Sequence, residues 1–151
     1  MIKIIFICHG NVCRSTMAEF LMKDMLQKEG LDHKFSISSR ATSTEELGNP
    51  VHPGTRKILN GLGISCEGKY ARQITKEECK TADMLIIMDE RNRRNLAPFL
   101  DGANEKVFTL LGFAGIDRDI ADPWYSHDFE STYRDVLLGC TALLKELKKR
   151  V

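Results

Sequence analysis

The sequence has 151 residues; 42% of them are hydrophobic, 28% are charged, and the formal net charge at pH 7 is +1. This length suits a single domain, residues 1–151, that can bury an ordinary core. A net charge so close to zero gives no field that would attract nucleic acid. We find no signal peptide and no membrane-spanning run. Five cysteines in no regular framework suit a reducing compartment, so we expect a cytoplasmic protein.

The first predicted elements are a strand and a helix joined by a short loop. Residues 4–7 are an apolar run typical of a buried strand, and helical periodicity follows from Met17 onward. The loop between them opens at Cys8 and closes at Arg14, which is followed by Ser15. Its backbone N–H groups, with those of the first helical turn, can face one concavity that holds a tetrahedral oxyanion.

The residue types in this loop suit nucleophilic chemistry on such an anion. A helix N-terminus and a nearby cation stabilise a thiolate, so we expect Cys8 to be ionised at neutral pH. The planar guanidinium of Arg14 can bind two phosphate oxygens. The Ser15 hydroxyl can donate a hydrogen bond to the Cys8 sulfur. The backbone between them is expected to line the anion site through His9, Gly10, Asn11, Val12 and Cys13.

Strands and helices then alternate along the chain. Strands are predicted at residues 34–38, 83–88 and 106–110, and helices around residues 58–62, from Asp89, and at residues 128–149. This alternation predicts an α/β fold of three layers: a four-stranded parallel sheet, flavodoxin-like, with helices on both faces. Ligands of such open sheets bind beyond the carboxyl ends of the strands, where the Cys8 loop begins.

The Cys-x5-Arg-Ser pattern after a strand, together with Asp122-Pro123-Trp124-Tyr125 near the end of the chain, resembles the low-molecular-weight protein tyrosine phosphatases. Similar segments also occur at residues 71–74 and 88–92 and in the final helix. The resemblance implies a fold of the phosphotyrosine phosphatase I type and hydrolysis of phosphotyrosine or aryl phosphates through a phosphocysteine intermediate. It implies no metal and no cofactor.

The resemblance also implies individual roles. Cys8 is the nucleophile, Arg14 the phosphate clamp and Asp122 the general acid and base. The resemblance also implies that Asn11 holds the loop in its backbone shape and that Ser39 supports Asn11 through a hydrogen bond. Substrate contacts are expected from the loop residues and from the aromatic side chains of Trp124 and Tyr125. Pro123, before them, is expected to make this segment rigid.

Several positions depart from the family pattern. Thr16 stands where proline is usual, so the helix start loses some rigidity. No histidine occurs around residues 68–70, and this absence predicts weaker support behind Asn11. Glu45 replaces an aromatic residue that often lines the pocket. A carboxylate there would repel acidic phosphopeptides, which leaves the choice of target open.

Plainer interpretations stay open for single residues. A lone cysteine such as Cys8 is usually a small buried apolar residue, and Trp124 and Tyr125 can simply shield the core. Cys13 can be a packing residue, or it can form a reversible disulfide with Cys8, as the resemblance implies. A zinc site at Cys8, His9 and Cys13 lacks a fourth ligand.

Three alternative functions remain beside the leading one. A thiol-dependent arsenate reductase would need a pair of downstream cysteines, and Cys79 has no partner at relay distance. A protein arginine phosphatase tends to carry threonine where Val12 stands. A phosphate-binding module without turnover would not need Cys8, Arg14 and Asp122 together. Expected partners are a phosphotyrosine protein or peptide and inorganic phosphate or another oxyanion; we expect neither nucleic acid nor membrane binding, and a monomer or a weak dimer.

Overall fold

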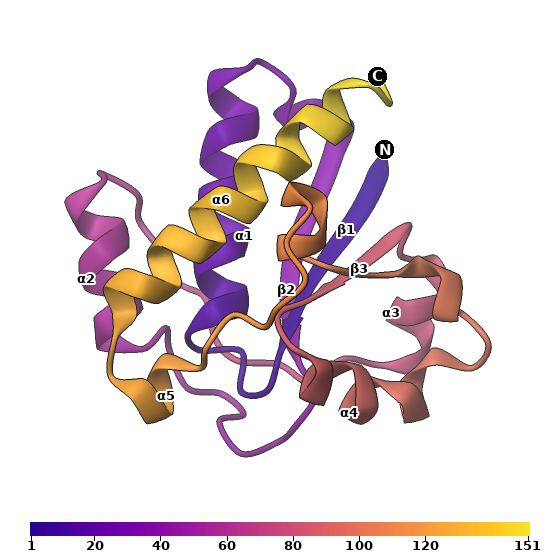
Figure 1. Cartoon of the computed structure of the whole chain (residues 1–151), viewed down its shortest axis with the longest axis horizontal. Coiled ribbons are helices and arrows are strands. Elements are labelled where there is room, and N and C mark those ends of the chain that lie inside the picture. Colours follow the sequence, from indigo (N-terminus) through magenta and orange to yellow (C-terminus); the bar gives the residue numbers. More distant parts are fainter.

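The computed structural model describes residues 1–151 and contains one parallel sheet of four strands in the order β2-β1-β3-β4 (Figure 1). Its strands are β1 (Ile2–Cys8), β2 (Phe35–Ala41), β3 (Met84–Ile87) and β4 (Val107–Thr109). The predicted fold class is therefore confirmed. No helix has the length and apolar character needed to cross a membrane.

β1 lies at the centre of the sheet and is covered on both faces. Ile4 and Phe6 belong to the larger hydrophobic cluster, and Ile5 and Ile7 belong to a second cluster on the opposite face. All four side chains are fully buried. Burial on both faces explains why the strand is a continuous apolar run rather than an alternating one.

The helices form two layers around the sheet (Figure 1). The larger cluster is covered by α1 (Arg14–Lys28), α2 (Pro53–Gly61) and α6 (Phe129–Lys148), and the smaller one by α3 (Lys76–Thr81) and α4 (Glu90–Leu100). The remaining short helices are α5 (Pro123–Ser126), η1 (Asp32–Lys34), η2 (Asn104–Lys106) and η3 (Leu111–Ala114).

Two details differ from the expectation. Helix α3 was not predicted, because its six residues are mostly polar and only Cys79 faces the core; a capping box between Thr75 and Glu78 marks its start. On α6, Leu137 and Leu144 are only partly buried, whereas Leu143 is fully buried. The spacing of apolar residues in 128–149 predicts Leu137 and Leu144, but not Leu143, on the inward face, so the buried stripe of α6 is rotated slightly from this prediction.

Close packing between α6 and the end of β4 gives a stability prediction. A Cβ added to Gly139 would lie 2.5 Å from Leu110 Cγ and 3.0 Å from its carbonyl oxygen. Gly139→Ala should therefore lower the free energy of unfolding by about 1–3 kcal/mol, although alanine favours a helix. The control is Gly61→Ala at the end of α2, where nothing lies within 4 Å; it should stabilise by up to about 1 kcal/mol. Urea unfolding measures both, and equal effects would contradict the packing argument.

Candidate active site

The loop after β1 is held in an unusual backbone shape by Asn11. Asn11 has a φ of 58°, in the left-handed region that asparagine tolerates better than most residues. Its Nδ2 donates hydrogen bonds to Ser15 Oγ (2.8 Å) and Ser39 Oγ (2.9 Å), and its Oδ1 accepts one from Arg72 N (3.2 Å). The side chain is almost fully buried. Asn11 thus ties the loop to α1, to β2 and to the segment before α3.

The Cys8 sulfur lies beneath this loop and has two polar neighbours. The backbone N–H of Asn11 donates to Sγ across 3.3 Å, and Ser15 Oγ lies 3.0 Å from Sγ. Because Ser15 Oγ already accepts a hydrogen bond from the Asn11 side chain, its own hydroxyl hydrogen is free to point at the sulfur. Both contacts place donors where a negative charge on sulfur would be stabilised.

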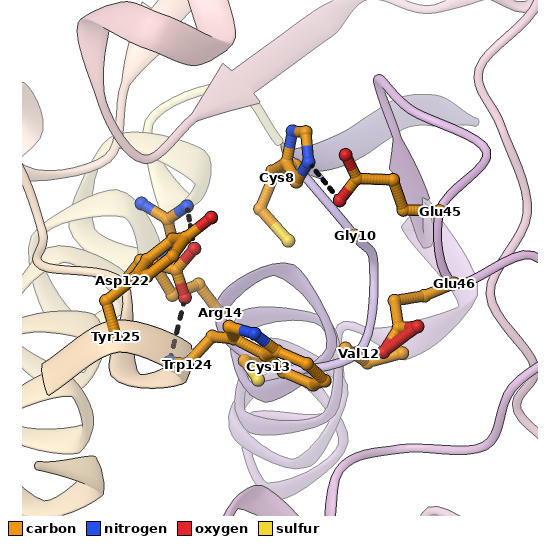
Figure 2. Close-up of a pocket in the computed structure, with 11 residues that line it drawn as sticks. Cys8, Gly10, Val12, Cys13, Arg14, Glu45, Glu46, Asp122, Trp124 and Tyr125 are labelled. Carbon is orange, nitrogen blue, oxygen red and sulfur yellow. Dashed lines mark hydrogen bonds and ion pairs between the residues drawn. The ribbon is translucent and has the colours of Figure 1, made fainter. Parts of the chain in front are cut away.

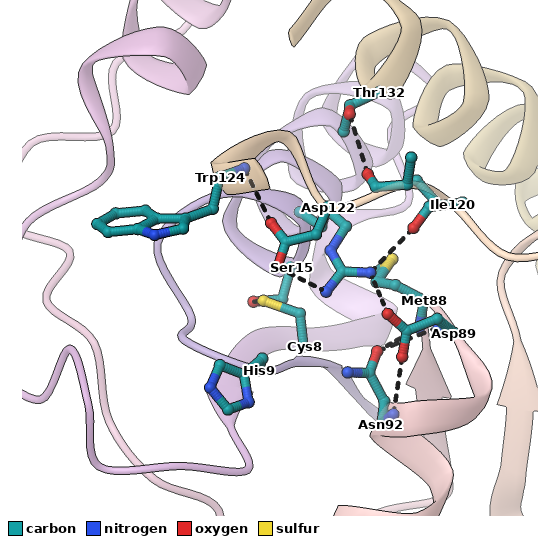
Figure 3. Close-up of polar contacts among 12 residues, drawn as sticks. Cys8, His9, Ser15, Met88, Asp89, Asn92, Ile120, Asp122, Trp124 and Thr132 are labelled. Atoms are coloured by element: carbon teal, nitrogen blue, oxygen red, sulfur yellow. Dashed lines mark hydrogen bonds and ion pairs between the residues drawn. The ribbon is translucent and has the colours of Figure 1, made fainter. Parts of the chain in front are cut away.

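Arg14 brings a buried positive charge to the same place, and Figure 3 shows Asp89, Ile120 and Asp122, which contact it. Its side chain is 2% exposed, and Nη1 donates to Asp89 Oδ2 (2.6 Å) and to the Ile120 carbonyl oxygen (2.9 Å). Burial alone would lower the pKa of Arg14, but the charges of Cys8, Asp89 and Asp122 outweigh it and raise the pKa. The guanidinium therefore remains charged at any physiological pH.

Asp122 reaches the pocket from the opposite end of the sequence. Its Oδ2 lies 3.4 Å from Arg14 Nη2, and its Oδ1 accepts a hydrogen bond from Trp124 N (3.0 Å) at the start of α5. The preceding loop is fixed because Ile120 N donates to the Met88 carbonyl oxygen and Thr132 Oγ1 donates to the Ala121 carbonyl oxygen. The Asp122 carboxylate is therefore held at the mouth of the loop.

These groups share one pocket, in which Asp122 and Tyr125 lie opposite Glu45 and Glu46 (Figure 2). The residues that line it are Cys8, His9, Gly10, Val12, Cys13, Arg14, Glu45, Glu46, Asp122, Trp124 and Tyr125. Of the other residues predicted at the site, Asn11, Ser15 and Ser39 have buried side chains beneath the loop, and Pro123 is buried at the start of α5.

A charged network lies behind the loop. The absence of a histidine at this place predicts weak support for Asn11. Ser39 Oγ donates to the buried carboxylate of Glu19, which also contacts Lys23 Nζ (2.6 Å) and Lys69 Nζ (3.4 Å). Lys69 in turn donates to the Ser39 carbonyl oxygen (2.9 Å). Burial lowers the pKa of Lys69, and the nearby Glu19 carboxylate opposes this shift. The expectation of weaker support is corrected: Lys69 and Glu19 supply contacts here.

The pocket rim carries two glutamates. Glu45 Oε2 lies 2.8 Å from His9 Nε2, and its side chain is 69% exposed. Glu46 Cγ would lie 3.3 Å from a Cβ on Gly10, so a side chain at position 10 would be crowded. Arg14 is the only lysine or arginine among the lining residues, and it is at the buried end. The rim is therefore acidic above a basic floor.

Cys13 lies close to Cys8 but has a different environment. Burial, followed by the charges of Cys8 and Asp122, raises the pKa of Cys13 well above its usual range. Its carbonyl oxygen accepts hydrogen bonds from Thr16 Oγ1 (3.0 Å) and Thr55 Oγ1 (3.2 Å), which hold Cys13 against α1 and α2. All cysteines are free thiols, and no group of three or more His, Cys, Asp or Glu side chains is placed to hold a metal ion.

Three residues at the site were missed by the sequence analysis: Asp89, Glu19 and Lys69. Asp89 was visible only as an acid at a helix start, and it does cap α4 through Oδ1, which accepts from Asn92 N (2.7 Å). Its second oxygen binds Arg14, which is 75 residues away in sequence. A capping pattern marks such a residue but does not reveal its second contact.

Comparison with known proteins agrees with this geometry. The family profile described as low molecular weight phosphotyrosine protein phosphatase matches residues 3–151. The chain belongs to this family. The prediction that it is a phosphatase enzyme is thereby confirmed, and its substrates are expected among phosphorylated proteins.

Individual relatives of this phosphatase cover almost the whole chain. The low molecular weight protein-tyrosine-phosphatase YfkJ of Bacillus subtilis is 37% identical over 155 residues, covering 99% of this chain and 97% of YfkJ. PtpA of Staphylococcus aureus, of the same description, is 34% identical over 150 residues, with 99% and 96% covered. The crystal structure of YfkJ superposes with a TM-score of 0.94, covering 99% and 96% at 34% identity. A structure of YwlE arginine phosphatase with a phosphorylated active-site serine has a TM-score of 0.86 at 27% identity, covering 98% and 97%.

The double role of Asp89 gives a prediction for phosphate binding. Asp89→Asn keeps an oxygen that can cap α4 but removes the negative charge next to Arg14. Because charge-assisted hydrogen bonds are worth about 1.5–3 kcal/mol, we expect the inhibition constant of inorganic phosphate to rise roughly tenfold to a hundredfold. Inhibition of aryl phosphate hydrolysis measures it.

The matched control is Asp135→Asn, which breaks the exposed ion pair of Asp135 with Arg118 outside the pocket. Exposed pairs contribute little, so phosphate inhibition should stay as in wild type. An Asp89→Asn enzyme that binds phosphate as well as this control would show that Asp89 does not orient Arg14.

Proposed function

We propose that this phosphatase hydrolyses phosphotyrosine in proteins, and aryl phosphates in general, through a phosphocysteine intermediate, with residues 1–151 acting as one phosphatase domain. The observation that carries the proposal is the meeting of three groups in one pocket: the Cys8 thiol, the buried Arg14 guanidinium and the Asp122 carboxylate. The last of these comes from a segment more than 100 residues away in sequence.

In the first step the phosphoryl group is bound by the loop and attacked by Cys8. The backbone N–H groups of the loop and the Arg14 guanidinium bind the phosphate oxygens, where charge is spread in the transition state. The Asn11 N–H, which donates to the Cys8 sulfur, and the Ser15 hydroxyl beside it stabilise negative charge that develops on the sulfur during the reaction. The sulfur forms a bond to phosphorus as the bond to the phenolic oxygen breaks.

Asp122 supplies the proton that the leaving group needs. A tyrosine phenolate is a poor leaving group because the pKa of the phenol is about 10. A carboxylic acid at the pocket mouth can protonate the bridging oxygen as the bond breaks. Asp122 is placed for this because its backbone is fixed and its carboxylate faces the pocket.

The second step releases phosphate from the sulfur. Asp122, now ionised, takes a proton from a water molecule that attacks phosphorus, and the sulfur departs as a thiolate. The same Ser15 hydroxyl stabilises that leaving thiolate. The acid and base roles of Asp122 thus follow one after the other from a single position.

The walls of the pocket support an aryl substrate. Trp124 and Tyr125 line the pocket and are 48% and 65% exposed, so both rings are open to contact with a ligand. Val12 adds an apolar surface beside the floor. Cys8 is 3% exposed, so a phosphate reaches it only by entering the pocket between these walls.

The first test removes each reacting group. Cys8→Ser should abolish phosphate release from para-nitrophenyl phosphate, because the nucleophile is lost. Asp122→Asn should lower kcat by roughly a hundredfold to ten-thousandfold. The loss should be larger for phenyl phosphate than for para-nitrophenyl phosphate, because the nitrophenolate needs less protonation.

A substrate panel separates the alternatives. Phosphotyrosine peptides should be hydrolysed faster than phosphoarginine peptides, and arsenate should not be reduced by added thiol. Preferential turnover of phosphoarginine, or arsenate reduction that depends on Cys8, would replace this proposal. Phosphate binding with no turnover of any of these compounds would indicate a binding module.

The acidic rim gives a prediction for target choice. Peptides with lysine or arginine beside the phosphotyrosine should have a kcat/KM roughly twofold to fivefold higher than peptides with acidic neighbours, as expected for an exposed charge contact. Glu45→Gln should reduce this ratio, and added salt should do the same. Glu105→Gln, at an exposed site on η2 before β4, is the matched control and should leave the ratio unchanged. An unchanged ratio in Glu45→Gln would exclude Glu45 as the selecting residue.

A further inference from the structure

His52 occupies a junction between the anion loop and the wall of the pocket. It is the N-cap of α2, where its Nδ1 accepts a hydrogen bond from Gly54 N (3.0 Å). Its backbone N–H donates to the Val12 carbonyl oxygen (2.9 Å), which is part of the loop over Cys8. His52 is not among the residues that line the pocket, so it acts on substrate only through its neighbours.

The imidazole ring of His52 lies between two aromatic side chains. It stacks on Phe129 with ring centroids 4.9 Å apart and planes 23° apart, and it meets Trp124 edge-on at 5.5 Å and 75°. Phe129 is the first residue of α6, and Figure 1 shows α5 and the beginning of α6 beside α2. The three rings therefore connect α2, α5 and α6 at the edge of the pocket.

The sequence makes room for this stack. A Cβ on Gly54 would lie 2.6 Å from the Phe129 ring, so only glycine lets Phe129 approach this closely. Phe129 also packs against a small buried cluster of Val12, Cys13 and Ala71, beside the anion loop. The ring under His52 is thus supported from below, whereas Trp124 on the other side is half exposed.

We infer that His52 is a positioning residue that holds the Trp124 indole as a fixed wall of the aryl site. This inference rests on the proposed function, in which Trp124 contacts the aryl group of the substrate. No other aromatic ring packs against Trp124, and its backbone is held by Asp122 rather than by the core. Without the imidazole, the indole has more orientations open to it and loses part of its contact with substrate.

The alternative role for His52 is that of a helix cap alone, and two substitutions separate the two roles. His52→Asn keeps a side-chain acceptor suited to an N-cap but removes the ring. His52→Phe keeps an aromatic ring but removes the acceptor. If His52 positions Trp124, His52→Asn weakens aryl binding and His52→Phe binds aryl substrates like wild type. If His52 is only a helix cap, His52→Asn behaves like wild type and His52→Phe is the altered variant.

Kinetics are the first readout. For His52→Asn we expect the KM for para-nitrophenyl phosphate to rise roughly threefold to tenfold, the size of an aromatic pair contact, with kcat within about twofold of wild type. The inhibition constant of inorganic phosphate should not change, because that ion does not reach Trp124. His52→Phe should return the KM close to the wild-type value while lowering the unfolding midpoint.

Fluorescence is the second readout, and it needs no substrate. Trp124 is the only tryptophan in the chain, so emission reports its surroundings directly. His52→Asn should shift the emission to longer wavelength and lower its anisotropy, and His52→Phe should change neither. His33→Asn, an exposed histidine on η1 before β2, is the matched control. If aryl phosphates prove not to be substrates at all, this readout still decides whether His52 holds Trp124.

A second variant covers the case in which His52→Asn does not fold. Phe129→Leu removes the ring beneath His52 while leaving an apolar side chain, and it should give the same rise in KM and the same spectral shift. The inference is overturned if His52→Asn leaves KM and emission unchanged, or if His52→Phe raises KM as much as His52→Asn does. It is also overturned if Phe129→Leu, once folded, leaves the spectrum of Trp124 unchanged.

Discussion

The structure of the site depends on one buried positive charge. An isolated guanidinium in the interior would cost several kcal/mol, so Arg14 must be paired where it lies. Its partners are the carboxylate of Asp89, the carbonyl oxygen of Ile120 and, more loosely, the carboxylate of Asp122. These come from the end of β3 and from the loop before α5. The same pairing that makes the charge tolerable therefore brings the segments of the site together.

The sheet order determines which segments can meet in this way. β1 lies between β2 and β3, so the chain winds in opposite directions on either side of it. In such sheets the loops after the two central strands separate to opposite faces and leave a crevice at the carboxyl ends. Cys8 ends β1, and Asp89 follows β3 by two residues. The thiol and the partner of the arginine are neighbours because their strands are neighbours.

The sequence predicted the parts of this arrangement that local patterns encode. The apolar run of β1, the spacing from Cys8 to Arg14 and the long amphipathic α6 are local signals, and each led to an element that the structure contains. Helix α3 was missed because a short polar helix at the surface has almost no apolar period. Asp89, Glu19 and Lys69 were missed for another reason: their partners are distant in sequence, and no spacing rule reveals such a contact.

The floor and the walls of the pocket are built in different ways. The floor residues Asn11, Arg14 and Ser15 are at most 2% exposed, and each is held by several hydrogen bonds, so a small change at any of them disturbs all. The wall side chains of Glu45 and Tyr125 are 69% and 65% exposed and have few partners, whereas Trp124, at 48% exposed, packs against the His52 ring.

This division has a consequence for how rate and selectivity can change. Phosphoryl transfer requires donors fixed within about 0.5 Å, which a buried network provides. Recognition of the group that carries the phosphate requires only contact area and charge, which the exposed side chains of the rim can vary without moving the floor. His52 packs against Trp124 of the wall and donates its backbone N–H to the Val12 carbonyl oxygen of the loop, so the wall and the loop are adjacent. One fixed set of reacting groups can thus serve different phosphorylated partners through changes at the rim alone.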